Sequence, residues 1–323
     1  MLRRLIPDKF VLWLIGAILL AVFAPVSAAP AAAVDVVTYT AIFALFFLHG
    51  ARLPREALIA GFSDVKLHGT ILFVTFGLFP VFGLTAMWLM PGLFDPLLWT
   101  GILFLCVVPS TVQSSIAYTS MAGGNVAGAV AAAAFSNMAG VVLTPLLASL
   151  LLDVQNIEIS ASGIGRIFAL LFLPFAIGHL LRPWILPWIT RWPALTTIVD
   201  KGTILLAVYG AFSAAMVDRV FDRVPGGQIF VLIAFCLVLL AFILGSSWMI
   251  GKSAGFDRGS RMAILFCGSV KSIASGAQMA KVMFSTWTLA LVLAPVMLYH
   301  TLQLLVCATI AGAIMRKRAA TES

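Results

Sequence analysis

Polar side chains interrupt two long apolar segments of the chain near their midpoints. The first interruption follows Pro109, and the second surrounds Lys271. The residues with the most binding chemistry in and near them are Gln113, Ser114, Ser115, Asn137, Lys271, Ser272, Ser275 and Gln278. Hydroxyls, amides and one fixed cation donate hydrogen bonds and supply positive charge, which suits an organic anion. The sequence contains no nucleophile–base pair, metal-ligand cluster or phosphate-binding loop, so these residues indicate a binding site and not an enzyme.

Lys271 is the most informative of these residues. It falls about eleven residues from either end of its apolar segment, which at about 1.5 Å per residue is roughly 16 Å. A lysine side chain is too short to reach a lipid headgroup from there. A cation at mid-membrane costs about 2.5–3.5 kcal/mol on insertion scales and is functional by default. We therefore predict that Lys271 serves the site or acts as an internal structural counter-ion. Its spacing from Ser275 and Gln278 predicts one shared helix face.

Three further groups of polar residues are weaker candidates. Residues 113–115 would open a second half-helix, whose N-terminal amides attract anions. Asn137 would add a polar contact to the site, or alternatively make an interhelical hydrogen bond. His49 and His300 titrate near neutrality and could relay protons. For both histidines an interfacial or hydrogen-bonding role is the simpler interpretation.

Composition places these residues in a membrane. Of the 323 residues, 62% are hydrophobic and 10% are charged, whereas soluble domains carry about 25% charged residues. The mean hydropathy is +1.10. A net charge of +8 would suit nucleic acid, because it could follow phosphates, but Arg and Lys lie in short clusters between long apolar runs. The sequence therefore predicts a polytopic membrane protein whose partner is the lipid bilayer, with no nucleic acid.

Ten apolar segments are each long enough to cross a bilayer, which takes roughly 20 residues. They are residues 10–29, 36–52, 66–90, 97–121, 125–152, 163–183, 198–218, 228–251, 260–284 and 287–315. Fifteen of the 20 Lys and Arg residues lie at one set of segment ends and four at the other, and the positive side is cytoplasmic. We therefore predict an all-α, multi-pass protein of the cell membrane with both termini cytoplasmic. Alternatively, residues 1–29 are a cleaved signal peptide, which would leave nine segments.

The ten segments divide into two halves of five, residues 1–152 and 153–323. Because each half would cross the membrane an odd number of times, the second half is inverted relative to the first. The interrupted segment is the fourth in each half, and a shift of 161 positions aligns three pairs of residues: Cys106 with Cys267, Thr111 with Ser272, and Ser114 with Ser275. Paired interrupted helices in inverted halves predict the binding site of a transporter. The alternative is a proline kink, with Ser and Thr packed between neighbouring helices.

Five stretches spread over nearly the whole chain resemble the bile acid:sodium symporter family, solute carrier family 10 in its broad, SBF-like sense. They are residues 46–53 (FFLHGARL), 109–115 (PSTVQSS), 123–127 (GGNVA), 143–147 (LTPLL) and 266–272 (FCGSVKS). The chain is more similar to the branch that contains the seventh human member and its bacterial relatives. This resemblance implies ten transmembrane helices as two inverted five-helix repeats, with panel and core domains built from both halves. It also implies that the fourth and ninth helices are interrupted and cross, with the substrate beside the crossing.

Family members of the bile-acid type carry amphipathic organic anions with two sodium ions, but this chain departs from their sodium pattern. Where the family has Ser-Asn, this chain has Ser114 and Ser115. The family's two hydroxyls, glutamate and glutamine fall here on Ala129, Ala133, Cys267 and Lys271. All 12 acidic residues lie at segment ends or in loops, so no carboxylate is available to a hard cation at mid-membrane. Neutral oxygens could still hold one sodium ion. We expect no cofactor, with Lys271 in the place of the cation.

These observations predict a secondary active transporter that carries a small organic anion by alternating access and is sodium-independent or proton-linked. The alternative is a membrane regulator or sensor that keeps the fold without transporting. That alternative follows from the resemblance, because the related eukaryotic branch is tied to calcium regulation.

Overall fold

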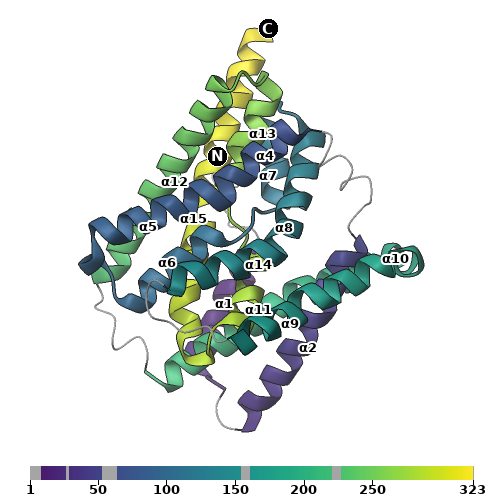
Figure 1. Ribbon diagram of the computed structural model, residues 1–323, viewed down its shortest axis with the longest axis vertical. Helices are drawn as coiled ribbons and strands as arrows, with labels where there is room; N and C mark the ends of the chain where they lie inside the picture. Colours follow the sequence, from purple (N-terminus) through teal and green to yellow (C-terminus); the bar gives the residue numbers. More distant parts are fainter. Residues whose placement is uncertain (1–8, 27–28, 53–63, 154–160, 220–226, 323) are drawn as a thin grey trace. The chain divides into compact units, whose positions relative to one another are not determined.

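A computed structural model describes residues 9–26, 29–52, 64–153, 161–219 and 227–322 of the protein (Figure 1). Within these ranges every regular element is helical. In chain order the elements are α1 (Lys9–Phe23), α2 (Ala29–Arg52), α4 (Val65–Phe73), the π-helix η2 (Val74–Leu78), α5 (Phe79–Leu89), the 3₁₀-helix η3 (Pro91–Leu93), α6 (Pro96–Val107), α7 (Gln113–Met121), α8 (Val126–Asp153), α9 (Ala161–Leu180), α10 (Arg182–Arg191), α11 (Pro193–Val217), α12 (Gly227–Ser253), α13 (Arg258–Ser269), α14 (Ile273–Met283) and α15 (Thr286–Glu322).

In the described residues, all ten predicted apolar segments are built from helices, so the expected all-α class is confirmed. Six helices in the described ranges are long and apolar enough to cross a membrane: Pro30–Arg52, Val65–Leu89, Val126–Leu151, Pro193–Val217, Gly227–Ser253 and Thr288–Arg318. Helices α9 and α10 would make a seventh span if counted together. The first, fourth and ninth predicted segments consist of shorter helices. Ten crossings are therefore not established by helix length alone.

One predicted boundary was wrong and another was confirmed. The segment predicted at 163–183 ends where α9 meets α10, at a bend of 91°. The bend follows from Pro183 in the first turn of α10, because proline has no N–H to continue the helical ladder. Helix α2 begins at Ala29 and not at residue 36, since alanines with an early proline favour a helix start. The cleavage site considered for residues 1–29 includes residues 27–28, which lie outside the described residues.

The chain forms two compact units, and each contains segments from both halves of the sequence. Unit 1 comprises Met1–Arg52, Ser160–Pro225 and Ala277–Leu293, and unit 2 comprises Leu53–Ile159, Gly226–Gly276 and Ala294–Ser323. Helices α14 and α15 contribute residues to both units.

In unit 1, α2 and α9 pack through a reciprocal pair of glycines. A Cβ atom added at Gly50 would lie 1.9 Å from the Phe175 carbonyl oxygen, and one added at Gly178 would lie 1.9 Å from that of Phe47. Each glycine thus contacts the carbonyl three residues before the other glycine. This approach is available only without a side chain, as in other close-packed membrane helices.

In unit 2, a continuous helical stretch from α4 to α5 packs near α8, α12 and α13. Its core includes Leu67, Ile71, Ala129, Ala132, Ala263, Ile264 and Cys267. The side chains of Asp64, Asp95 and Asp257 cap the N-termini of α4, α6 and α13 by accepting backbone hydrogen bonds. Such caps satisfy amides that a helix cannot pair internally.

Both interruptions predicted from the sequence are present in unit 2. Helix α6 ends at Val107 and α7 begins at Gln113, while α13 ends at Ser269 and α14 begins at Ile273. Val108 and Val270 adopt extended backbone. Pro109 cannot donate to the helical ladder, which explains why α6 stops there. We call residues 108–112 the first break and residues 270–272 the second break.

Candidate functional site

The two breaks are hydrogen-bonded to each other. The Ser272 backbone N–H donates to the Pro109 carbonyl at 2.8 Å, and the Ser110 hydroxyl donates to the Cys267 carbonyl at 2.6 Å. The Ser110 N–H donates to the Ser136 hydroxyl on α8 at 3.2 Å. Backbone groups that left their helices at the breaks thus find partners in protein and not in lipid, as buried polar groups must.

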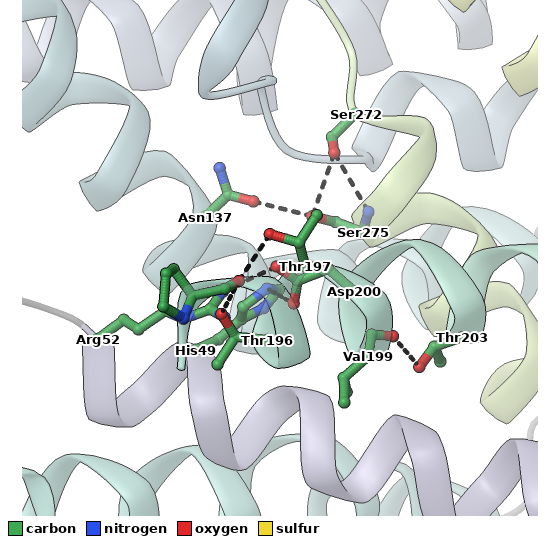
Figure 2. A network of polar contacts seen from close by, with 11 residues as sticks. His49, Arg52, Asn137, Thr196, Thr197, Val199, Asp200, Thr203, Ser272 and Ser275 are labelled. Atoms are coloured by element: carbon green, nitrogen blue, oxygen red, sulfur yellow. Dashed lines mark hydrogen bonds and ion pairs between the residues drawn. The ribbon is translucent and has the colours of Figure 1, made fainter. Parts of the chain in front are cut away.

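Three predicted site residues, Asn137, Ser272 and Ser275, come together beside the breaks (Figure 2). The Ser275 hydroxyl donates to Asn137 Oδ1 at 2.8 Å, and the Ser272 hydroxyl donates to that of Ser275 at 3.3 Å. Asn137 Nδ2 donates to the carbonyls of Ser110 and Ala133, each at 2.9 Å. The interhelical hydrogen bond considered for Asn137 therefore exists, and Asn137 joins α8 to the first break and to α14.

The predicted residues of the first break open α7. Gln113 is exposed and Ser114 half-buried, whereas Ser115 is buried. The hydroxyls of Thr111 and Ser114 share a hydrogen bond, and the Ser115 hydroxyl donates to the Thr111 carbonyl. The hydroxyls of Ser115 and Thr111 thus serve the local turn, while Gln113 and Ser114 stand at the helix N-terminus.

The hydroxyl pairs of the two breaks correspond to each other in the sequence. Thr111 pairs with Ser114, and Ser272 pairs with Ser275. These are the positions that a shift of 161 residues aligns. Each pair lies three residues apart at the start of the helix that follows its break. The two halves of the chain therefore share a local hydrogen-bond pattern as well as a weak sequence likeness.

Lys271 holds the second break against the first. Its side chain is fully buried, and Nζ donates to the carbonyls of Thr75 at 2.8 Å, Cys106 at 2.9 Å and Val108 at 2.8 Å. Nζ also lies 3.9 Å from the centroid of the Phe79 ring, a cation–π distance. Since an ammonium group has three protons, all of them are used by these carbonyls.

Each carbonyl that Lys271 contacts has lost its helical partner. In η2 the Phe79 N–H donates to Val74 and not to Thr75, and Pro80 at the next position has no N–H. At the end of α6, the Ser110 N–H donates to Ser136 instead of Cys106. The ammonium therefore satisfies one carbonyl that the π-helix leaves without a helical partner and two at the end of α6, which carry the partial negative charge of a helix end.

Other side chains satisfy the neighbouring carbonyls at the two breaks. The Thr144 hydroxyl on α8 donates to the Val107 carbonyl at 2.7 Å. The Tyr299 hydroxyl on α15 donates to the Ser269 carbonyl at 2.8 Å. Thr144 belongs to one of the stretches that carried the family resemblance, and its contact gives that stretch a structural role.

The predicted shared helix face was wrong for Lys271. Lys271 lies in the second break, before α14 begins at Ile273, so helical spacing does not relate it to Ser275 and Gln278. The glycines and polar residues of this stretch end the helix early. Gln278 is buried in the part of α14 that belongs to unit 1, whereas Lys271 and Ser275 belong to unit 2.

Gln303 is a site residue that the sequence analysis missed. It is fully buried on α15, its Oε1 accepts from the Lys271 backbone N–H at 2.7 Å, and its Nε2 donates to the Lys271 carbonyl at 2.7 Å. His300 Nδ1 lies 2.9 Å from Gln303 Nε2 and 3.1 Å from the same carbonyl, so His300 belongs to this hydrogen-bond network. An amide inside the apolar segment 287–315 was the available signal for Gln303.

Unit 1 carries separate polar contacts of its own. Arg52 Nη1 lies 2.8 Å from Asp200 Oδ2, and His49 Nε2 lies 3.8 Å from Asp200 Oδ1 (Figure 2). Lys281 Nζ lies 2.6 Å from Asp35 Oδ1, and the Lys281 side chain is 1% exposed. The sequence placed the charged members of both groups at segment ends and did not anticipate their pairing.

Comparison with known proteins adds independent information. Residues 8–316 match the family described as the SBF-like CPA transporter family. The chain is 44% identical over 316 residues to the uncharacterized protein PA2026 of Pseudomonas aeruginosa, covering 98% of this chain and 95% of that one. It is 41% identical over 310 residues to YfeH of Escherichia coli, whose name includes the word symporter, with 96% and 93% covered. It is 28% identical over 315 residues to sodium/bile acid cotransporter 7-B of Xenopus laevis, with 94% and 91% covered.

Proposed function

Because the chain belongs to the SBF-like CPA transporter family, we propose that it is a secondary transporter that carries an organic anion across the cell membrane by alternating access. Its membership of a family of membrane transporters agrees with its long apolar helices. The observation that carries the proposal is the buried ammonium of Lys271, which holds two interrupted helices together. Interrupted helices in a membrane mark transport sites.

The proposed fold has ten membrane-spanning helices in two inverted repeats, residues 1–152 and 153–323. In this arrangement α6 with α7 is the fourth span, and α13 with α14 is the ninth. Two observations support it: the corresponding hydroxyl pairs at the two breaks, and the mixed composition of each unit. Unit 1 would be the panel domain and unit 2 the core domain.

The proposed substrate site lies at the breaks. Its polar contacts would come from Gln113, Ser114, Ser115, Asn137, Ser272 and Ser275, all in unit 2. The start of α7 would add helix N-terminal amides, which favour an anion. Lys271 would contribute positive potential and not direct hydrogen bonds, because its three protons are already used by carbonyls.

We also propose that Lys271 replaces sodium. An ammonium tethered at the end of α6 supplies the positive charge that carbonyl ends need. It would also repel sodium, because two unit charges about 4 Å apart at an effective dielectric near 20 repel by roughly 4 kcal/mol. Transport should then be independent of sodium, and a proton remains available as the coupling ion.

The experiment begins with a thermal-shift screen of the purified protein against organic anions, with organic cations as the control set. An anion that raises the melting temperature is then labelled and tested for counterflow in proteoliposomes, in sodium and in choline buffers. Equal counterflow in both buffers is expected. Counterflow that requires sodium would contradict the replacement of sodium by Lys271. Binding without any counterflow would contradict transport and favour the regulator.

A further inference from the structure

The orientation of the Gln303 side-chain amide is fixed by the second break. Its Oε1 atom must be the oxygen, because it accepts a hydrogen bond from the Lys271 backbone N–H at 2.7 Å. The other atom, Nε2, is therefore the NH₂ group, and it donates one proton to the Lys271 carbonyl at 2.7 Å. Gln303 thus binds both backbone groups of Lys271 at once. We call this pair of hydrogen bonds the Gln303 clamp.

The second proton of Gln303 Nε2 faces His300. Nε2 lies 2.9 Å from His300 Nδ1, and an NH₂ group only donates. This contact is a hydrogen bond when His300 Nδ1 accepts with its lone pair, and in that tautomer the imidazole is neutral and carries its proton on Nε2. The hydrogen-bond network assigns this tautomer.

We propose that His300 is a proton-binding site and that protonation of its Nδ1 atom releases the Gln303 clamp on Lys271. An added proton on Nδ1 would face the Gln303 NH₂ group, where two donors repel. It would face the Lys271 carbonyl as well, which lies 3.1 Å away and accepts it. Protonated His300 thus takes over the carbonyl that Gln303 holds, and the bidentate amide contact is lost.

Loss of the Gln303 clamp would affect both breaks, because Lys271 makes contacts that link them. Its ammonium holds the end of α6, and the next residue donates to the Pro109 carbonyl. Movement of the Lys271 backbone therefore changes contacts on both interrupted helices. This inference rests on the proposed function only in naming the proton as the coupling ion, because proton binding itself needs no substrate.

Other titratable groups lie on the elements around this network. They are Lys271 in the second break, Tyr299 on α15, and the buried thiols of Cys106 on α6, Cys236 on α12 and Cys307 on α15. Tyr299 is engaged with the Ser269 carbonyl. The test must therefore separate titration of His300 from titration of Lys271.

Hydrogen–deuterium exchange of the full chain in nanodiscs provides that test. Exchange of a peptide that covers residues 268–276 is measured at about pH 5.5 and about pH 8, on either side of a histidine pKa, and corrected for chemical exchange. In the wild type we expect acidification to increase exchange of this peptide on the order of tenfold, as local opening becomes easier. His300→Asn should abolish this pH dependence, because Asn keeps an acceptor near Nδ1 and cannot take up the proton.

The control is His179→Asn, whose Nδ1 atom also lies near a backbone carbonyl, that of Gly50 at 3.3 Å, but within unit 1. It should keep the wild-type pH dependence. A wild type without pH-dependent exchange would overturn the proposal. So would a His300→Asn variant that keeps the dependence while Lys271→Met loses it. If His300→Asn does not fold, His300→Gln takes its place, and its exchange at the two pH values is compared with that of the wild type. A failure of counterflow leaves this test unaffected, so the two proposals fail separately.

Discussion

Lys271 is a buried cation that is stabilised by dipoles. In the described part of the chain its ammonium contacts three carbonyl oxygens and the face of Phe79. Carbonyls at a broken helix end carry partial negative charge. The carbonyls therefore stabilise the buried ammonium, and the ammonium gives the unpaired carbonyls a hydrogen-bond donor. This mutual dependence makes Lys271 sensitive to substitution.

Lys271→Ala should lower both stability and ligand binding. The substitution leaves three buried carbonyls without a donor, and each costs about 1–3 kcal/mol. Thermal unfolding in detergent should show a large drop in melting temperature. Lys252→Ala is the matched control, because Lys252 is exposed at the end of α12, and it should melt like the wild type. Equal melting of the two variants would show that the contacts of Lys271 are not stabilising.

Asp257, the exposed N-cap of α13, gives a prediction about pH-dependent stability. Hydrogen bonds from the side chain and backbone of Ser260, with a further one from Gly259, hold its pKa below the ordinary carboxyl value. A lowered folded-state pKa means that the stabilisation is present above the ordinary pKa and is lost as the pH falls through the folded-state pKa. Asp257→Ala should therefore reduce stability by about 1 kcal/mol at neutral pH, as loss of an N-cap does. The difference from wild type in chemical unfolding should shrink in acid, and a difference that grows there would contradict the assignment.

At the scale of elements, α2 and α9 depend on close approach of their backbones. Gly178→Ala places a methyl group 1.9 Å from the Phe47 carbonyl, and a backbone oxygen can yield only if the helices separate. Overpacking of this kind costs about 1–3 kcal/mol. Gly202→Ala on α11 is the control, because its added methyl has nothing within 4 Å. Thermal unfolding should show a lower melting temperature for Gly178→Ala alone.

Helix α10 has the features of a helix that lies in the membrane interface. It turns by 91° from α9, it begins and ends with arginine, and Trp184 and Trp188 on it are 72% and 48% exposed. Tryptophan and arginine favour the headgroup region. We expect a spin label at residue 188 to report headgroup depth in bilayers by electron paramagnetic resonance. A label at Leu173 on α9, which is also exposed, should report a deeper position, and equal depths would contradict the assignment.

At the scale of the whole molecule, the distribution of cations predicts topology. Fifteen of the 20 Lys and Arg residues fall on the side assigned to the cytoplasm, and ten crossings return the chain to its starting side. Accessibility tagging of cysteines added at residues 1 and 323 should therefore label both from the cytoplasmic face. Labelling from opposite faces would require an odd number of crossings and would refute the ten-span arrangement.

The sequence by itself determined which parts of the chain are helical and where two helices break. Apolar runs of about 20 residues predict spans because a bilayer has a fixed thickness, and Pro109 and the polar residues around Lys271 interrupt helices through local chemistry. The interruptions were expected after Pro109 and around Lys271, and the breaks lie at residues 108–112 and 270–272. These features depend on residues that are neighbours in the sequence, so the sequence alone was enough to predict them.

Only the tertiary structure decided which groups meet. The Lys271 ammonium donates to the carbonyls of residues 75, 106 and 108, and the Lys271 backbone N–H donates to Gln303. The pairing of Asp35 with Lys281 joins residues 246 positions apart. Hydropathy indicates that a buried polar group needs a partner, but many donors and acceptors of the same kind could satisfy it. Which one does so depends on how helices distant in sequence pack, because a hydrogen bond forms only when packing brings its two atoms within about 3 Å.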